Sequence, residues 1–517
     1  MIDDLTYRRF SQYLTILITI SVGYRLFPYL FYSGIIGLDP HWYAVQISTV
    51  IDGGTTADIA SPYYREAAGY IVYLAVILEI LGLEPVDAGL VVAIFVGILP
   101  PLVGSVVVLQ LTGRRWYPAL VTAGILVVIQ PLVRYSLWPI AQSLAILLFI
   151  VLFSVVLKLL SLENVHDDRV KPMTLLLFVL IIALALVHKF PVFIVALLLV
   201  CIAVASKLRI ISNPAISSKL LGFIGIVLLS VWVLMTEFAA NVILMTSELI
   251  FGGITVYSAP LEPAAATREK TGLVYILGRN LHWMALVIVS GVSWLAHIYN
   301  LHYQRYSERS KSALVFLLIS SSLLMVILGA SVIGGAVINP TRVVLLSALV
   351  LPILIGSSIT YLGENRSITV AIVICLVVTQ GIAFGTLPDD DTSARSFLNN
   401  GELEGKEFMN EYSPKPIYTD TYYAKAVSDP SNPNPWFMHS PNSQYQSYDQ
   451  AVFNGSFSPL NPDRVAYRTK VDVYGHVPFG GYWSLDWKPR AELTTCAHRT
   501  YSNPNVEFYN TTPCEFE

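Results

Sequence analysis

Three ionisable residues lie at the ends of apolar segments, and together their side chains could transfer a group away from a phosphate. Asp39 stands in "GLDPHWY", Lys189 in "LALVHKFPVFIV" and Arg342 in "NPTRVVLLSALVLPILIG". A carboxylate can take the proton of an acceptor hydroxyl as a new bond forms. Lys and Arg donors can stabilise the charge of a departing phosphate. These residue types therefore suggest a general base beside an anion site.

Arg134, His41 and Glu66 are further candidates for the same site, as an auxiliary cation and as polar groups beside the carboxylate. Each candidate also has a plainer interpretation. Asp39 can cap the helix that begins at the next residue, a proline. His41 can pack at the membrane interface between aromatic residues, Glu66 can be merely solvated, and a lone Arg or Lys can extend to the headgroups.

The composition is that of a membrane protein. Of 517 residues, 55% are hydrophobic and only 13% are charged, a balance typical of polytopic membrane proteins and not of a soluble core. No phosphate-binding loop of the G-x-x-x-x-G-K-[ST] type and no Cys/His spacing of a zinc site occurs. We expect the bilayer as a partner and no nucleic acid.

Long uncharged runs predict about eleven membrane spans, because a crossing helix needs about 20 apolar residues. The outer loop 34–88 carries two amphipathic stretches that we expect to lie in the plane of the interface. The loop 247–279 is interpreted as a flexible connector, with a lid over a lipid carrier as the alternative. The predicted spans are 11–33, 89–112, 116–136, 140–161, 173–188, 190–206, 219–240, 280–300, 313–335, 342–361 and 368–386.

The Lys and Arg residues favour one orientation. With 69–83 in the interface and not across it, most basic loop residues fall on one side, which the positive-inside rule assigns to the cytoplasm. The N-terminus is then cytoplasmic, and the C-terminal region lies outside the plasma membrane. Seven basic residues remain on the outer side: Arg65, Arg134, Lys189, Arg268, Lys270, Arg279 and Arg342.

The composition changes near residue 387, which predicts a transmembrane domain (1–387) and a small soluble domain (388–517). Short Tyr- and Val-bearing runs such as "RVAYRTKVDVYGHV" alternate with the period of strands, so the second domain is expected to be α/β or mostly β. Cys496 and Cys514 fall in it and could pair in an oxidising exterior or remain free thiols. Cys201 and Cys375 lie in apolar segments and are expected to be inert.

The order of several short motifs resembles the GT-C superfamily of membrane glycosyltransferases. "GLDPHWY" and "SPYYREAAGYIVYL" are similar to that family's outer-loop acid and the Pro/Tyr motif of its second in-plane helix. "QPLVRYSLWPIAQSLAI", "HKFPVFIV" and "NPTRVVLLSALVLP" resemble its later motifs, and "EYSPKPIYTDTYYAKAV" and "HRTYSNPNVEFYN" look like the tails of prokaryotic members, archaeal ones included. Protein O-mannosyltransferases and aminoarabinose transferases belong to this superfamily.

The resemblance implies transfer of a sugar from a polyprenyl (dolichyl) phosphate carrier to a glycan, lipid or protein acceptor on the outer face, with inversion. Asp39 is the expected base, and Lys189 and Arg342 are expected to hold the phosphate with help from Arg134. Many members carry a second acid where this chain has Gln142, and an amide is a poorer ligand for a hard divalent cation. We therefore expect no cofactor. Binding of a divalent metal ion is the alternative, and it is not favoured.

Two other functions compete with this interpretation. A transporter or flippase for a lipid-linked or polar substrate would place ionisable residues or broken helices at the middle of the membrane, often in paired halves. No internal repeat is found, and the candidate charges lie at helix ends. A non-catalytic scaffold on the same fold is the second alternative, and Gln142 in place of an acid keeps it open.

Overall fold

The computed structural model describes most of the chain. The described residues are 4–31, 35–37, 39–56, 58–59, 67–162, 168–211, 222, 225, 266–269, 273–303, 308–333, 340–361, 366–385, 398–413, 416–426, 445–458, 460, 462–469, 473–476, 482–512 and 514.

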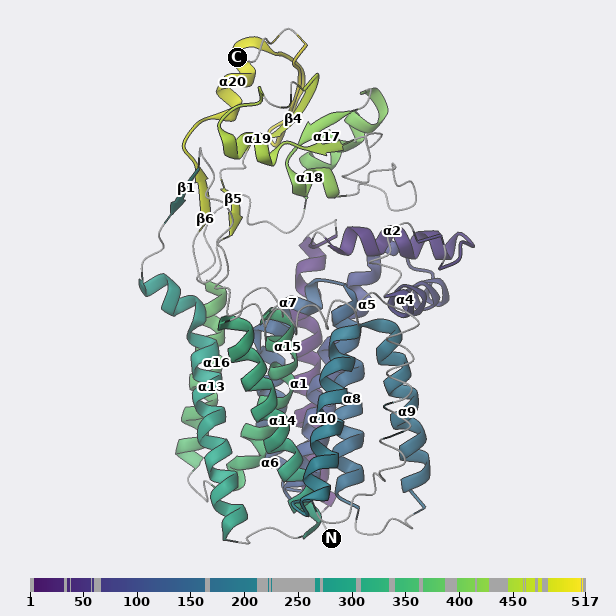
Figure 1. Cartoon of the computed structure of the whole chain (residues 1–517), viewed down its shortest axis with the longest axis vertical. Helices are drawn as coiled ribbons and strands as arrows, with labels where there is room; N and C mark the ends of the chain where they lie inside the picture. The colour runs from purple at the N-terminus through teal and green to yellow at the C-terminus, as the bar shows by residue number, and fades with distance from the viewer. Residues whose placement is uncertain are drawn as a thin grey trace.

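A bundle of long apolar helices makes up the larger part of the protein (Figure 1). Within the described ranges, eight helices can cross a bilayer by length and composition, and a bent pair, α6–α7, supplies a ninth span. The protein is therefore a multi-pass membrane protein. The eight helices and the bent pair are α1 (Asp4–Phe31), α5 (Ala88–Leu111), α6 (Trp116–Val128), α7 (Gln130–Leu137), α8 (Ala141–Leu160), α9 (Val170–Val187), α10 (Lys189–Lys207), α13 (Leu273–His302), α14 (Glu308–Ile333) and α15 (Pro340–Ser358). A further helix of the bundle is α16 (Arg366–Gly385).

Nine of the predicted spans correspond to these crossing helices and the bent pair. The predicted span 368–386 falls on α16, whose described apolar part is shorter, Thr369–Gln380. The predicted span 219–240 lies almost entirely outside the described residues.

The predicted single span 116–136 is wrong in one respect, because α6 and α7 meet at a bend of 50°. Pro131 has no N–H and clashes with the preceding helical turn, so a straight helix cannot continue through it. Buried side chains bind the backbone groups that the break releases. Arg25 of α1 donates to the Leu126 carbonyl (3.4 Å) and to Ser21 Oγ (2.6 Å), and Gln380 of α16 accepts from the Gln130 N–H (2.8 Å).

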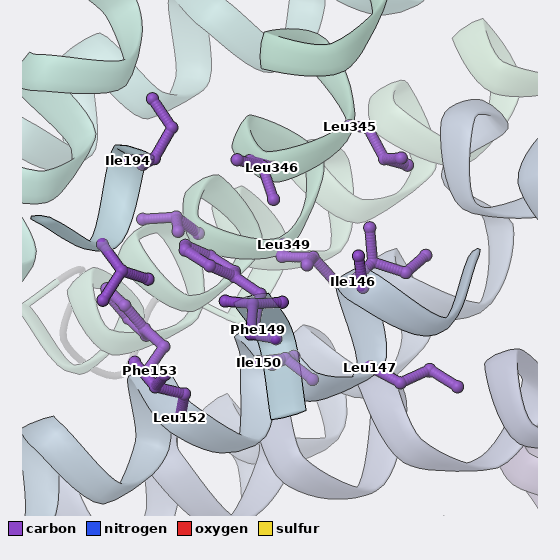
Figure 2. Close-up of a cluster of buried hydrophobic side chains, with 14 of the residues drawn as sticks. Ile146, Leu147, Phe149, Ile150, Leu152, Phe153, Ile194, Leu345, Leu346 and Leu349 are labelled. Carbon is purple, nitrogen blue, oxygen red and sulfur yellow. The ribbon is translucent and has the colours of Figure 1, made fainter. Parts of the chain in front are cut away.

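Helix α15 is the most enclosed of the crossing helices and lies against α8. Figure 2 shows Phe149 and Ile150 of α8 facing Leu346 and Leu349 of α15, all of them almost fully buried. Lipid tails are as apolar as leucine, so such contacts stabilise the bundle by close packing more than by removal from water. Gly356 shows how close the packing is, because a Cβ there would lie 1.7 Å from Thr122 Oγ1 of α6.

Two shorter helices, α2 (Asp39–Ile51) and α4 (Ala68–Leu81), lie at one end of the bundle. Figure 1 shows α2 lying across this end, between the bundle and the C-terminal region. The two helices pack together through Tyr43 and Tyr70, whose ring centroids are 4.9 Å apart. A short turn of helix, η1 (Pro85–Asp87), leads from α4 into α5. We call this end of the bundle the α2 end.

The C-terminal region contains a five-stranded mixed sheet with helices, so of the two predicted classes it is α/β. The strand order is β3-β2-β4-β8-β7, with β2 parallel to β3 and β4 and the remaining pairs antiparallel. The strands are β2 (Ile417–Thr419), β3 (Tyr445–Ser447), β4 (Arg464–Arg468), β7 (His498–Ser502) and β8 (Val506–Asn510); the helices are α17 (Asn400–Tyr412), α18 (Thr421–Lys425), α19 (Asp449–Asn454) and α20 (Pro489–Cys496).

Both faces of this sheet are buried, as the two-residue period of its strands requires. Ala466 and Phe508 pack on one face with Met409 of α17. Val465 and Tyr509 point the other way and pack with Leu493 of α20. Cys496 and Cys514 form a disulfide with a Cα–Cα distance of 5.0 Å, which decides between the two alternatives left open by the sequence.

A second, three-stranded sheet joins distant parts of the chain. Strand β1 (Ala266–Glu269) comes from the loop ahead of α13 and pairs antiparallel with β6 (Tyr482–Leu485), which pairs with β5 (Val473–His476). Part of the loop 247–279, interpreted from its sequence as a flexible connector, is therefore a strand. The residues from 247 to 265 lie outside the described part of the chain.

Candidate functional site

Asp39 begins α2 immediately after a tight turn of the backbone. Gly37 has φ +97°, a conformation that favours glycine. A Cβ on Gly37 would also lie 3.1 Å from the Pro40 ring and 3.2 Å from the Trp138 ring. The turn thus fixes the start of α2 against the end of α7, and the Asp39 side chain is exposed there.

Two cations from distant parts of the chain act on the charge of the Asp39 carboxyl. Although Asp39 has exposed surface, the protein atoms around its carboxyl partly desolvate it and raise its pKa above its ordinary value, while the charges of Lys425 on α18 and Arg342 on α15 lower it. No hydrogen bond to the Asp39 carboxylate, including one from the first turn of α2, is found in the described part of the chain. An ionisable carboxyl without a fixed donor is accessible to a substrate hydroxyl.

Arg342 lies near the start of the enclosed helix α15, so the packing of that helix determines its position. The side chain is partly exposed, but its Nε is buried and makes no hydrogen bond within the described ranges. A buried donor without a partner costs free energy, typically about 1–3 kcal/mol. Native proteins usually satisfy such groups, so an exception suggests a place for a ligand.

Lys189 occupies the break between α9 and α10. His188 is extended (φ −161°, ψ 124°), and its Nδ1 accepts the Phe190 N–H at 3.2 Å, which caps α10. Lys189, partly exposed, is then the first residue of α10. The charges of Lys189 and Arg342 both act on His188. Arg342 is therefore the residue whose charge acts both on Asp39 and on the α9–α10 break where Lys189 lies.

The remaining predicted residues are placed as follows. Arg134 is exposed, and its guanidinium carbon lies 4.4 Å from the centroid of the Trp138 ring, the same ring that touches Gly37. His41 is buried, and its ring stands edge-on to that of Tyr422 at 6.5 Å. Gln142 is partly buried in the first turn of α8. Glu66 lies outside the described residues.

Sequence reasoning missed Lys425 and Tyr422, which approach Asp39 and His41 from the C-terminal region. Their segment, "YTDTYYAKAV", has the composition of an ordinary polar tail. Tyr422 and Lys425 differ from other residues of this tail by their proximity to α2 in the folded protein. The sequence signal that could have prompted a search was the cluster of aromatic residues around a lone lysine.

No group of three or more His, Cys, Asp or Glu residues arranged to hold a metal ion is found among the residues that the structure describes. Asp39 is the acid on which Arg342 and Lys425 act, and the position of the family's second acid carries Gln142. One carboxylate beside two cations suits an anionic ligand.

The chain matches no protein-family model and no curated protein sequence. Its structure is similar to that of the oligosaccharyltransferase of Archaeoglobus fulgidus, with a TM-score of 0.58 and 13% identity over 98% of this chain and 75% of that one. It is also similar to ArnT of Cupriavidus metallidurans, with a TM-score of 0.52 and 11% identity over 97% of both chains.

The chain has the GT-C fold. The similarity extends over nearly the whole chain, the C-terminal region included. ArnT has also been solved with undecaprenyl phosphate bound, and that structure matches this chain with a TM-score of 0.51. At these identities the likeness shows the architecture alone. The chemistry of this chain has to be inferred from the residues at its α2 end.

Proposed function

We propose that this GT-C protein transfers a sugar from a polyprenyl-phosphate carrier to an acceptor hydroxyl or amide at the α2 end of the bundle. The observation that carries the proposal is that the charge of Arg342 on α15 acts both on Asp39 of α2 and on His188, the residue before Lys189 at the start of α10. The fold supports it, since structures of this fold include an oligosaccharyltransferase and an ArnT bound to undecaprenyl phosphate.

The proposed reaction needs one base and one anion site. Asp39 takes the acceptor proton while the acceptor atom attacks the anomeric carbon. The bond between that carbon and the phosphate oxygen breaks, and the electron pair leaves with the phosphate. Arg342 and Lys189 stabilise this growing charge. The attack from the opposite side inverts the anomeric carbon, because no enzyme carboxylate forms a covalent intermediate. The acceptor is a glycan, a lipid or a peptide.

We also propose that the α2 end faces the exterior, with the N-terminus in the cytoplasm and residues 388–517 as a separate outer domain. The distribution of Lys and Arg supports this orientation. The Cys496–Cys514 disulfide supports it too, since disulfides persist in oxidising compartments. Protease added to intact cells should then remove the C-terminal region, while an inward-facing domain would be protected.

The buried polar groups of the bundle support a transporter less well than they support the proposed transferase. Arg25 is fully buried, but it is bonded to Ser21 and to the carbonyl released at the α6–α7 break. His297 of α13 is likewise buried and lies 2.9 Å from Ser357 Oγ of α15. These groups stabilise contacts between helices, whereas Asp39 and Arg342, which make no hydrogen bond with the described residues, lie at the α2 end.

The Asp39→Asn variant tests the proposed function. Purified protein would be mixed with native membranes and with undecaprenyl- or dolichyl-phosphate hexoses that carry a tritiated sugar, and transfer to non-extractable acceptor would be followed. We expect Asp39→Asn to reduce turnover by about 10²- to 10⁴-fold, the usual contribution of a general base. Asp52→Asn, the same change just beyond α2, should leave turnover unchanged. Full turnover in Asp39→Asn would refute the proposal.

A further inference from the structure

Buried charges hold the short helix α18 at its N-terminal end. Asp420 caps the helix, since its Oδ1 accepts the Tyr423 N–H at 3.0 Å. Arg468 of β4 grips the same carboxylate with two bonds, Nε to Oδ2 at 2.7 Å and Nη2 to Oδ1 at 2.6 Å. A bidentate pair of this kind fixes orientation as well as distance. The start of α18 is therefore immobilised on the sheet.

A second buried cation holds the other end of α18. The Lys406 ammonium donates to the carbonyl groups of Tyr423 and Ala426, and it lies 3.4 Å from the Ala424 carbonyl. These are the carbonyl groups that a helix leaves unbonded at its C-terminus. Tyr423 also donates its hydroxyl to the Glu402 carbonyl at 2.6 Å. With both ends held, α18 presents a defined face to its surroundings.

The face turned away from the sheet carries Tyr422 and Lys425. Tyr423 and Ala424 are buried in the domain core, whereas Tyr422 and Lys425 are partly exposed. Residues three apart lie on the same side of a helix. Tyr422 stands edge-on to His41 of α2, and Lys425 acts on the charge of Asp39. Figure 1 shows α18 on the side of the C-terminal region that faces α2.

The two cations that face Asp39 would behave differently once a donor binds. Under the proposed function, the donor phosphate occupies Arg342, and its negative charge offsets that of the guanidinium. Lys425 belongs to the C-terminal region, and its charge acts on Asp39 across the contact between Tyr422 and His41. It remains the uncompensated cation beside the carboxyl. His41 and Tyr422 are the other titratable groups at this contact, and His188 lies behind Arg342.

We propose that Lys425 is a positioning residue that keeps Asp39 ionised while the donor phosphate is bound, so that the C-terminal domain completes the site. This inference rests on the proposed function. It also explains why both ends of α18 are held by buried charges, because the charge of a lysine acts steadily on one carboxylate only if its helix is fixed in position. It also predicts that loss of the Lys425 charge alters the loaded enzyme more than the free one.

The test compares pH profiles of three variants of the full-length protein in the tritiated-sugar assay. The acid limb of kcat reports the donor-bound enzyme, and that of kcat/KM reports the free enzyme. Lys425→Met should move the acid limb of kcat upward by about one pH unit, the effect expected for loss of one nearby opposite charge. The shift in kcat/KM should be smaller, because Arg342 still faces Asp39. Lys425→Arg should retain the native profile.

Lys488→Met is the matched control, because Lys488 is an exposed lysine of the same domain. A purely structural role for Lys425 would lower the melting temperature or the rate without moving the acid limb. An unmoved acid limb of kcat in Lys425→Met, with Asp39→Asn inactive, would overturn the inference and leave the proposed function standing. Full activity of Asp39→Asn would instead remove the proposed function, and the inference with it.

Discussion

The protein contains two groups of charged residues that share the same chemistry and differ in how they are bonded. In the C-terminal region, Arg468 is buried, donates two hydrogen bonds to Asp420 and lies 3.5 Å from Glu402. At the α2 end, Asp39 and Arg342 interact through charge, and neither makes a hydrogen bond within the described residues. Charges that satisfy one another build structure, whereas charges left unbonded are available to a ligand.

This comparison explains why burial alone does not identify a site. Arg468 is more deeply buried than Arg342, yet its donors are already in use. A buried ion pair is destabilising to break, because the surviving partner remains as an uncompensated charge. Removing the charge of Asp39 or of Arg342 breaks no hydrogen bond to a described residue. Substitutions of the buried charges around Arg468 should therefore lower stability. Substitutions of the charges at the α2 end should lower activity with little change in stability.

The largest effect is expected from Arg468→Ala. Loss of this guanidinium leaves the buried carboxylates of Asp420 and Glu402 without their ion-pair partner, and breaking a buried pair costs about 3–5 kcal/mol. The C-terminal domain should unfold at a much lower temperature and become sensitive to protease. Thermal unfolding in detergent measures this. Arg464→Ala on the same strand is the control, and equal melting temperatures for the two variants would contradict the structural role.

A smaller effect is expected from Gly37→Ala, which displaces the start of α2 without changing any charge. The added Cβ meets Pro40 and Trp138 and requires a left-handed backbone, at a cost of about 1–2 kcal/mol. Turnover should fall about tenfold, and less than in Asp39→Asn, because the base is moved and not removed. Gly53→Ala has a similar backbone (φ +87°) with nothing within 4 Å of the added Cβ. Equal losses in both variants would show that strain alone is responsible.

Much of the membrane bundle could be predicted from the sequence, because each span is a local apolar run whose length the bilayer dictates. The bend between α6 and α7 was missed, since it depends on Pro131 together with buried partners that come from α1 and α16. The strand β1 was missed for a similar reason, because four residues of a loop become a strand only beside β6.

The candidate site was predictable in part. Asp39, Lys189 and Arg342 stood out because charged residues are rare at the ends of such apolar helices. That Asp39 and Arg342 interact could not be inferred without the fold. Lys425 has only the aromatic residues around it as a local signal, and that signal does not indicate which residue of the bundle it meets. The catalytic roles of these residues remain predictions.

Binding of undecaprenyl phosphate to the purified protein tests the central claim most directly. The variants Lys189→Ala and Arg342→Ala would be compared with Lys207→Ala, at the opposite end of the same helix α10, and with Arg9→Ala at the exposed start of α1. Native mass spectrometry would measure affinity, with undecaprenol as the uncharged control ligand.

We predict that each α2-end variant binds undecaprenyl phosphate about 10- to 100-fold more weakly, as expected for loss of one hydrogen bond to a charged group. Undecaprenol binding, the two control variants and the melting temperatures should be unchanged. Native affinity for undecaprenyl phosphate in both Lys189→Ala and Arg342→Ala would contradict the claim that these cations form a phosphate site.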